Sequence, residues 1–332
     1  MTASGETAAR FRLGWVVRLA ISALVLALLL YLLPVRDVLA TMRRIELRDW
    51  LVTLAVFMAG HVVSAAKWQL LANSGADFRT VLRAHFSGLL ANLYLPGVAG
   101  GDVVRAALLY RKVPDKARLA LGSVADRLID TIGVLLIAAA GLLLATSRLE
   151  SGSALLMWVG IALALFSAGA VLGVKFHPLL LRRLPAHSRL ARVGEQIGAS
   201  IVVLSRQKSR LALCLVLSVF VQCAFILATI GLANAAGVHA PVAAWFFAWP
   251  LSKLIATLPI SIAGIGVREA SLAGFLAPFG APAAAIVGIG LLWQTIQLAG
   301  ALLGGLFVVL SGHAFAGRPT PKPLEADTHD SR

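Results

Sequence analysis

Long runs of apolar residues constrain the fold of this chain more than any other feature of its sequence. Most of them reach roughly 18 residues or more, the length of helix that crosses a bilayer of about 30 Å. They do not alternate between apolar and polar residues as the strands of a membrane barrel do, so we expect membrane-spanning helices. The runs are residues 16–33, 51–66, 128–145, 154–174, 211–235 and 283–310.

The composition agrees with an all-α, polytopic transmembrane bundle. The sequence is 59% hydrophobic and only 14% charged, whereas soluble domains carry about 25% charged residues. The net charge of +15 would suit a nucleic-acid-binding protein, but Lys and Arg collect in short segments between the apolar runs. We therefore expect no nucleic acid as a partner. A single membrane domain should cover residues 16–312, between a basic tail at 1–15 and a disordered tail at 313–332.

The placement of the basic residues predicts the orientation in the plasma membrane. The N-terminal tail is basic and segment 175–210 is rich in Lys and Arg, so both should be cytoplasmic, like the C-terminus. Segment 34–49 should lie outside yet holds several arginines, and we interpret it as an interfacial helix. Run 16–33 follows arginines as a signal peptide does, but its length and the lack of a cleavage site predict a retained anchor.

Two further apolar regions, 81–112 and 244–279, are interrupted by proline and glycine. Proline removes a helical hydrogen-bond donor, and clustered glycines disfavour helix. Each half is too short to span the membrane, so we expect two re-entrant helix–break–helix hairpins. Irregular backbone of this kind is tolerated within the membrane only where it is buried in protein or lines a water-filled cavity. The expected break residues are Pro96, Gly97, Pro259, Gly264 and Gly266.

The two interrupted regions look like copies of one unit. At an offset of 163 residues, Pro96 aligns with Pro259, Gly101 with Gly264, and Arg105 with Arg268. The flanking runs follow the same register, which gives one repeat at about 50–146 and another at about 211–310. Run 154–174 adds a crossing between them, so the second repeat should be inverted. Paired interrupted segments of this kind point to the binding site of a transporter.

Charged residues cluster next to both breaks. A charge at mid-bilayer costs roughly 2.5–3.5 kcal/mol, so such residues need a partner or a purpose. Asp102 and Arg105 either form a phosphate seat at a helix N-terminus or a helix cap with a local ion pair. Arg268 and Glu269 open the second helix, either as part of a site or as a self-neutralised pair. The predicted substrate-binding residues are Gly100, Gly101, Asp102, Arg105, Asp126, Arg127, Asp130, Arg268 and Glu269.

Asp126 and Asp130 share a face of the run that follows the first break, at helical i, i+4 spacing. They could pair with Arg105 or Lys112 across the bundle, and Arg127 is within reach of Asp130. The alternative is that they mark the interfacial start of the span, in headgroup water.

Two other lysines occur near or within apolar segments. Lys67 and Trp68 end the second run and are interpreted as ordinary interface anchors. Lys253 lies inside the first arm of the second hairpin, at a depth comparable to Asn92 in the first hairpin, and both could face a cavity. No spacing typical of a metal site and no nucleotide or nucleophile motif occurs, so we expect no metal, no cofactor and no enzyme activity.

Three motifs together resemble a known family. They are Leu-Pro-x-x-x-Gly-Gly-Asp-x-x-Arg at 95–105, Asp-Arg-Leu-x-Asp at 126–130, and Pro-x-Ser-x-x-Gly-x-Gly-Val-Arg-Glu at 259–269. The chain resembles the lysylphosphatidylglycerol synthase transmembrane-region proteins, also called flippase-like domain proteins, over roughly 10–312. Carried over by position, the motif residues are Pro96, Gly100, Gly101, Asp102, Arg105, Asp126, Arg127, Pro259, Gly264, Gly266, Arg268 and Glu269.

The resemblance implies a plasma-membrane domain that moves an aminoacylated phosphatidylglycerol between leaflets. Two departures stand out: Asp126 replaces the usual glutamate of the middle motif, and Ala263-Gly264 replaces a frequent Gly-Gly. The shorter acid should change the reach of a pairing with Arg105. The soluble aminoacyl-transfer domain of the synthase is absent from this sequence, so the chain should not make the lipid.

We therefore expect a lipid transporter whose two breaks meet near the midplane. Arg105 and Arg268 would hold the phosphate of an anionic or zwitterionic headgroup, balanced by the neighbouring acids. One alternative is a membrane-embedded transferase that uses Asp102 or Asp126 as its base. Another is a non-transporting partner that recruits a lipid-modifying enzyme through segment 175–210. A lipid-modifying enzyme and a second copy of the chain are the protein partners considered.

Overall fold

The computed structural model describes residues 20, 23–29, 31–72, 75–93, 99–110, 113, 115–145, 206–257 and 264–316. Within these ranges the chain is helical and contains no strand. The elements are α2 Val35–Arg44, α3 Leu47–Ala72, α4 Phe78–Ala91, α5 Ala99–Tyr110, α6 Lys116–Ala145, α9 Lys208–Ala235, α10 Val242–Thr257, α11 Val267–Leu276, the 3-10 turn η2 Ala277–Phe279, and α12 Ala283–Ala316.

Four of these helices, α3, α6, α9 and α12, are long and apolar enough to cross a membrane. They contain the predicted runs 51–66, 128–145, 211–235 and 283–310, so the chain is a multi-pass helical membrane protein. Run 154–174, most of the basic segment 175–210, the predicted N-terminal tail and residues 317–332 lie outside the described residues, as do residues 16–19, 21–22 and 30 of run 16–33. Residues 313–316, predicted to belong to the disordered tail, continue α12 instead.

The start of α6 differs from the expected one. We expected the span to begin near residue 128, with an interfacial position of Asp126 as one alternative, but α6 begins at Lys116 and Asp126 is buried within it. The interfacial interpretation of Asp126 is therefore wrong. The helix continues through the charged residues because each of them finds a partner of opposite sign, as described below.

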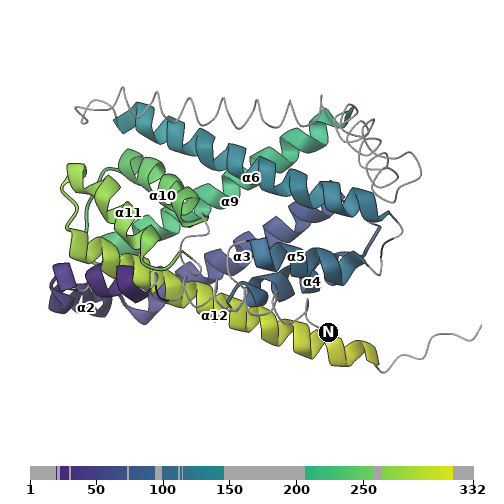
Figure 1. Cartoon of the computed structure of the whole chain (residues 1–332), viewed down its shortest axis with the longest axis horizontal. Helices are drawn as coiled ribbons and strands as arrows, with labels where there is room; N and C mark the ends of the chain where they lie inside the picture. Colours follow the sequence, from purple (N-terminus) through teal and green to yellow (C-terminus); the bar gives the residue numbers. More distant parts are fainter. Residues whose placement is uncertain are drawn as a thin grey trace, which may run out of the picture.

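The helices form a bundle in which α6 and α12 run along opposite sides (Figure 1). The pair α4–α5 lies at one end between them, with α4 against α12 and α5 against α6. The pair α10–α11 lies at the other end, with α10 against α6 and α11 against α12. Helices α3 and α9 pack against each other within the bundle, so both short-helix pairs surround the same interior.

Aromatic side chains fill the centre of the bundle. Phe57 and Phe225 stack with ring centroids 5.6 Å apart, and Trp293 packs edge-on against Trp249 at 4.9 Å. Gly60 allows α3 and α9 to approach, because a Cβ on it would overlap the ring of Phe225. Small residues at such contacts are typical of membrane helices. Leucine and valine side chains on the outer faces remain exposed, as expected of surfaces that contact lipid.

Both interrupted regions form pairs of short helices, as the prolines and glycines predicted. The pairs are α4–α5 and α10–α11, while Pro96, Gly97 and Pro259 themselves lie outside the described residues. Gly264 and Gly266 adopt φ angles of 74° and 82°, a left-handed conformation that favours glycine. Helix α5 already begins at Ala99, so Asp102 lies within the first turn and not at the predicted capping position.

The segment predicted as an interfacial helix, 34–49, contains α2 and the first residues of α3. Val38 and Thr41 bury one face of α2, and Gly288 of α12 lies so close that a Cβ on it would be 3.0 Å from the Val38 carbonyl oxygen. Arg36 and Arg43 on α2 are exposed. This arrangement leaves α2 with one apolar side on the bundle and its basic residues on the outside.

Candidate functional site

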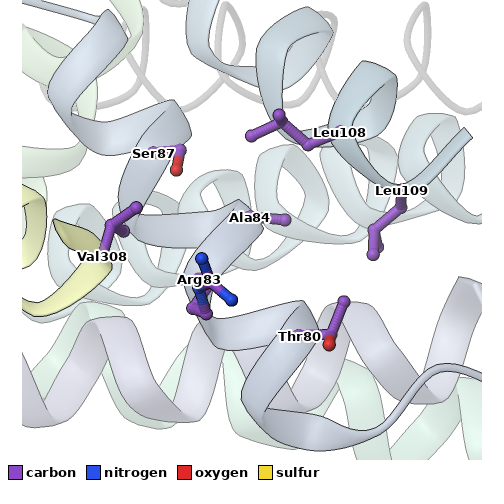
Figure 2. Close-up of a pocket in the computed structure, with 7 residues that line it drawn as sticks. All are labelled: Thr80, Arg83, Ala84, Ser87, Leu108, Leu109 and Val308. Atoms are coloured by element: carbon purple, nitrogen blue, oxygen red, sulfur yellow. The ribbon is translucent and has the colours of Figure 1, made fainter. Parts of the chain in front are cut away.

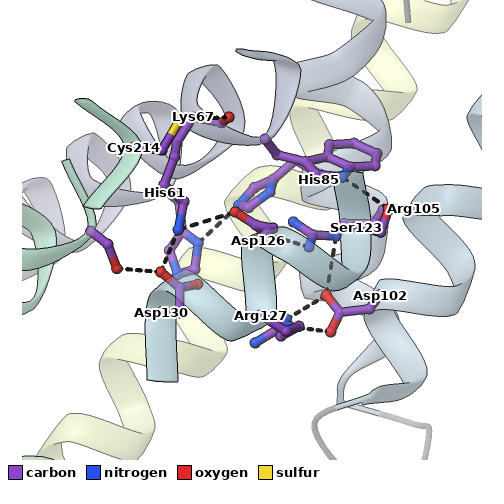
Figure 3. Close-up of polar contacts among 12 residues, drawn as sticks. His61, Lys67, His85, Asp102, Arg105, Ser123, Asp126, Arg127, Asp130 and Cys214 are labelled. Carbon is purple, nitrogen blue, oxygen red and sulfur yellow. Dashed lines mark hydrogen bonds and ion pairs between the residues drawn. The ribbon is translucent and has the colours of Figure 1, made fainter. Parts of the chain in front are cut away.

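Charged side chains from three helices meet in the interior of the bundle (Figure 3). Helix α3 supplies Lys67, which lies near the end of the span. Helix α5 supplies Asp102 and Arg105, one turn apart. The same polar region receives Asp126, Arg127 and Asp130 from the first half of α6.

These six residues form a row in which the charges alternate in sign. Lys67 contacts Asp130, and its Nζ also lies 3.1 Å from Asp126 Oδ1. The other carboxylate oxygen of Asp126, Oδ2, accepts a hydrogen bond of 2.7 Å from Arg105 Nη2.

Beyond this bond, Arg105 Nε lies 3.1 Å from Asp102 Oδ1, and Asp102 also pairs with Arg127. We call the row Asp130–Lys67–Asp126–Arg105–Asp102–Arg127 the charge row. It holds three acids and three bases, so its formal charge is zero.

The middle of the charge row is buried and its two ends are open. The side chains of Lys67, Arg105 and Asp126 are 3–4% exposed. At the ends, Asp130 is 28% exposed and Arg127 is 45% exposed. Buried charges are tolerated when they are paired, because pairing offsets the cost of removing them from water. The row can therefore exist at membrane depth and still present one acid and one base to a ligand.

Neighbouring side chains fix the position of the row. The Arg105 guanidinium lies over the Trp68 ring at 4.5 Å from its centroid, and Trp68 Nε1 donates to Ser123 Oγ at 3.1 Å. The Ser218 hydroxyl of α9 donates to Asp130. These contacts connect α3, α5, α6 and α9, so the row depends on the packing of four helices.

The close approach of α4 to α5 depends on two glycines. The Gly101 amide donates to the Asn92 side-chain oxygen at 2.8 Å. A Cβ on Gly101 would overlap the carbonyl oxygen of Gly88. Because Asp102 and Arg105 follow directly on α5, this contact sets where both side chains enter the charge row. Asn92 is thus part of the hairpin packing, whereas we had predicted that it could face a cavity.

A cavity of about 320 Å³ adjoins the charge row. Asp102, Arg127 and Asp130 line one side of it, and Lys253 and Thr257 of α10 line another. The Lys253 ammonium donates to Gln222 Oε1 at 2.9 Å, and no carboxylate among the described residues pairs with it. Since the charge row is neutral, the row and Lys253 together carry a formal charge of +1.

A second group of charged residues lies at the start of α11, where Arg268 and Glu269 pair with each other. Glu269 is fully buried, and its Oε2 accepts from the Gly266 amide at 2.7 Å. Arg268 Nη2 donates to Glu269 Oε1 at 2.8 Å and to the Gly290 carbonyl oxygen at 3.2 Å, while its Nη1 donates to Gln297 at 2.9 Å. Arg268 is therefore already saturated with partners inside the protein.

The structure brings five of the predicted site residues together in the charge row: Asp102, Arg105, Asp126, Arg127 and Asp130. Arg268 and Glu269 form the separate group at α11, with no ion pair to the row among the described residues. The expected Asp102–Arg105 and Arg105–Asp126 pairs are present. Arg127 pairs with Asp102, whereas we had placed it near Asp130.

Lys253 lines the cavity as predicted, whereas the prediction for Lys67 is wrong. Lys67 and Trp68 are both buried, so their interpretation as interface anchors is wrong. The signal was available, because a lysine inside a helix long enough to span the bilayer needs a partner. His61 and His85 were not singled out either, although His61 Nδ1 lies 3.1 Å from His85 Nε2 next to the row. Ser218 and Gln222 lie inside the apolar run 211–235 and were not singled out, because neither side chain is ionisable.

The fold and the site together define a multi-pass helical membrane protein with a charged interior. The chain belongs to the lysylphosphatidylglycerol synthase transmembrane-region family, whose sequence pattern matches residues 15–305. This finding confirms the resemblance that the three motifs indicated. A comparison with curated proteins gave no match.

Proposed function

We propose that the protein translocates a lipid headgroup between the leaflets of the plasma membrane, with both termini in the cytoplasm. The observation that carries this proposal is the cavity of about 320 Å³ lined by Asp102, Arg127, Asp130 and Lys253. A cavity with this many charges inside an apolar bundle needs a polar occupant. The membership in a family of membrane proteins named for a lipid synthase is consistent with a lipid as that occupant.

The headgroup chemistry follows from which charges are unpaired. Arg105 and Arg268, which we first expected to hold the phosphate, are engaged with Asp126 and Glu269. Among the residues that the structure describes, the neutral side chain of Gln222 is the partner of Lys253. We therefore assign the phosphate to Lys253, and its positive charge favours an anionic headgroup over a cationic one. A zwitterionic headgroup would add an ammonium group at the exposed carboxylate of Asp130.

We further propose that the chain is an inverted repeat with two re-entrant hairpins, α4–α5 and α10–α11. The element order long–short–short–long occurs twice, as α3–α6 and as α9–α12. The packing supports this proposal, because equivalent helices of the two halves make equivalent contacts. Helix α4 packs on α12 as α10 packs on α6, and α5 packs on α6 as α11 packs on α12. In such transporters the substrate site lies at the interface between the repeats.

Leaflet exchange in proteoliposomes tests this function. The assay follows labelled phosphatidylglycerol with the Lys253→Gln variant and, as a control with the same charge loss, Lys116→Gln, whose ammonium lies over the Tyr110 ring. We expect Lys253→Gln to slow exchange about 10- to 100-fold, because a hydrogen bond to a charged group contributes about 1.5–3 kcal/mol. The control should keep the parental rate.

Two results would count against the proposal. Equal exchange rates for the parent and Lys253→Gln would show that Lys253 does not bind the headgroup. A change in the mass of the recovered lipid would indicate chemistry, and the protein would then be a transferase. Exchange that continues without any lipid modification is the outcome expected of a transporter that is not an enzyme.

A further inference from the structure

A second cavity lies between α4, α5 and α12, apart from the charge row (Figure 2). Its volume is about 140 Å³, and it shares no lining residue with the cavity beside Lys253. Arg83, Thr80 and Ser87 of α4 line it with polar groups. We propose that this cavity binds the phosphate group of a membrane phospholipid, at a site that is separate from the proposed transport cavity.

The polar groups in this cavity lack partners within the described part of the chain. Arg83 makes no hydrogen bond or ion pair there, and its Nε is buried without a partner. Thr80 and Ser87 lie on the same helix face as Arg83, three residues before and four residues after it, and neither hydroxyl makes a hydrogen bond among the described residues. In contrast, Arg105 and Arg268 inside the bundle are both paired.

The chemistry of these groups selects an anion. A guanidinium presents donors in a planar fork that matches the oxygens of phosphate, and hydroxyls add further donors. No carboxylate lines the cavity, so nothing there neutralises Arg83. A buried, unpaired polar group destabilises the protein. A phosphate oxygen accepting from Arg83 Nε and from the hydroxyls would satisfy all of them at once.

The apolar walls favour a phospholipid as the source of the phosphate. Leu108 and Leu109 of α5 and Val308 of α12 form these walls. Leu108 is 47% exposed, and Leu310, two residues after Val308 on α12, is 64% exposed. The volume accommodates a phosphate but not the acyl chains, which would lie along these exposed leucines. A phospholipid bound in this way contacts three helices and would hold α4–α5 against α12.

Lipid binding measured by native mass spectrometry tests this site, and the test does not depend on transport. The variant is Arg83→Gln, and the control is Arg118→Gln on α6, which removes the same charge outside the cavity. Both are made in the parent and in Lys253→Gln. The probes are phosphatidylglycerol, a diacylglycerol with the same chains, and inorganic phosphate. Arg83→Lys keeps the positive charge but lacks the planar guanidinium. Melting temperatures measured without lipid check that each variant is folded.

We expect Arg83→Gln to weaken phosphatidylglycerol binding at least about 10-fold, with Arg83→Lys intermediate and Arg118→Gln unchanged. Diacylglycerol should not bind at this site, because it lacks the phosphate. The effect should be the same in the Lys253→Gln background, since separate sites contribute additively. Equal binding by Arg83→Gln and Arg118→Gln would overturn the proposal. Inorganic phosphate that binds as tightly as the lipid, and is lost in Arg83→Gln, would overturn the lipid assignment and identify a site for the free anion.

Discussion

Replacing Lys67 with methionine is the sharpest test of the charge row, because this one ammonium serves two carboxylates. Its Nζ lies 3.1 Å from Asp126 and also contacts Asp130. Removing one partner of a buried ion pair costs about 3–5 kcal/mol, mostly because the other charge is left unpaired. Two features place the expected cost at the lower end. Asp126 keeps its 2.7 Å bond from Arg105, and Asp130 is 28% exposed to the cavity. We therefore expect a loss of about 3 kcal/mol in the free energy of unfolding.

The measurement is reversible unfolding in mixed detergent micelles, with Lys116→Met as the control. Lys116 is exposed and its ammonium lies over the Tyr110 ring, so its replacement should cost less than about 1 kcal/mol. Combining Lys67→Met with Asp130→Asn should recover part of the loss, because the second change removes a carboxylate that the first left unpaired. A cost for Lys67→Met no larger than that of the control would refute the reasoning that the row holds α3 against α6.

Further predictions concern the packing of the short helices. Gly101→Ala should destabilise the protein by about 1–3 kcal/mol in the same unfolding measurement, because the added Cβ overlaps the Gly88 carbonyl oxygen. Gly274→Ala is its control and should be neutral or slightly stabilising, since nothing lies within 4 Å of the added atom. Glu269→Gln should cost about 3 kcal/mol, because it leaves the buried Arg268 without a counter-charge. Combining Glu269→Gln with Arg268→Met should recover part of that loss, and no recovery would contradict the pairing.

The sequence predicted the interrupted helices well because proline and glycine act locally. Pro96 and Pro259 with their following glycines indicated where two apolar regions must stop being helical, and α4, α5, α10 and α11 lie on either side of those points. The pair Arg105–Asp126 was also expected, since a buried arginine near a break needs an acid within reach. These inferences required only neighbouring residues or a known cost of burial.

The lysines of the site were harder to assign because their partners are distant in sequence. Lys67 lies on α3 and its carboxylates lie on α6, while Lys253 of α10 is held by Gln222 of α9. The burial cost indicates that such a lysine needs a partner, but nothing local in the sequence identifies which residue supplies it. The start of α6 was misplaced for a related reason. A charged residue that is paired across the bundle resembles, in the sequence, one at the interface, so an interfacial position of Asp126 stayed open as an alternative.

Alternation of sign along the row affects what can enter it. A ligand with one positive and one negative group can pair with both Asp130 and Arg127 at the open ends of the row. A purely cationic or purely anionic ligand pairs with one of these two residues and leaves the other without a ligand partner. With the Lys253 ammonium included, the charge row and its neighbouring cavity have a combined formal charge of +1. A bound ligand with a net charge of about −1 would thus make the interior neutral, and a low dielectric constant strengthens the interactions that favour this balance.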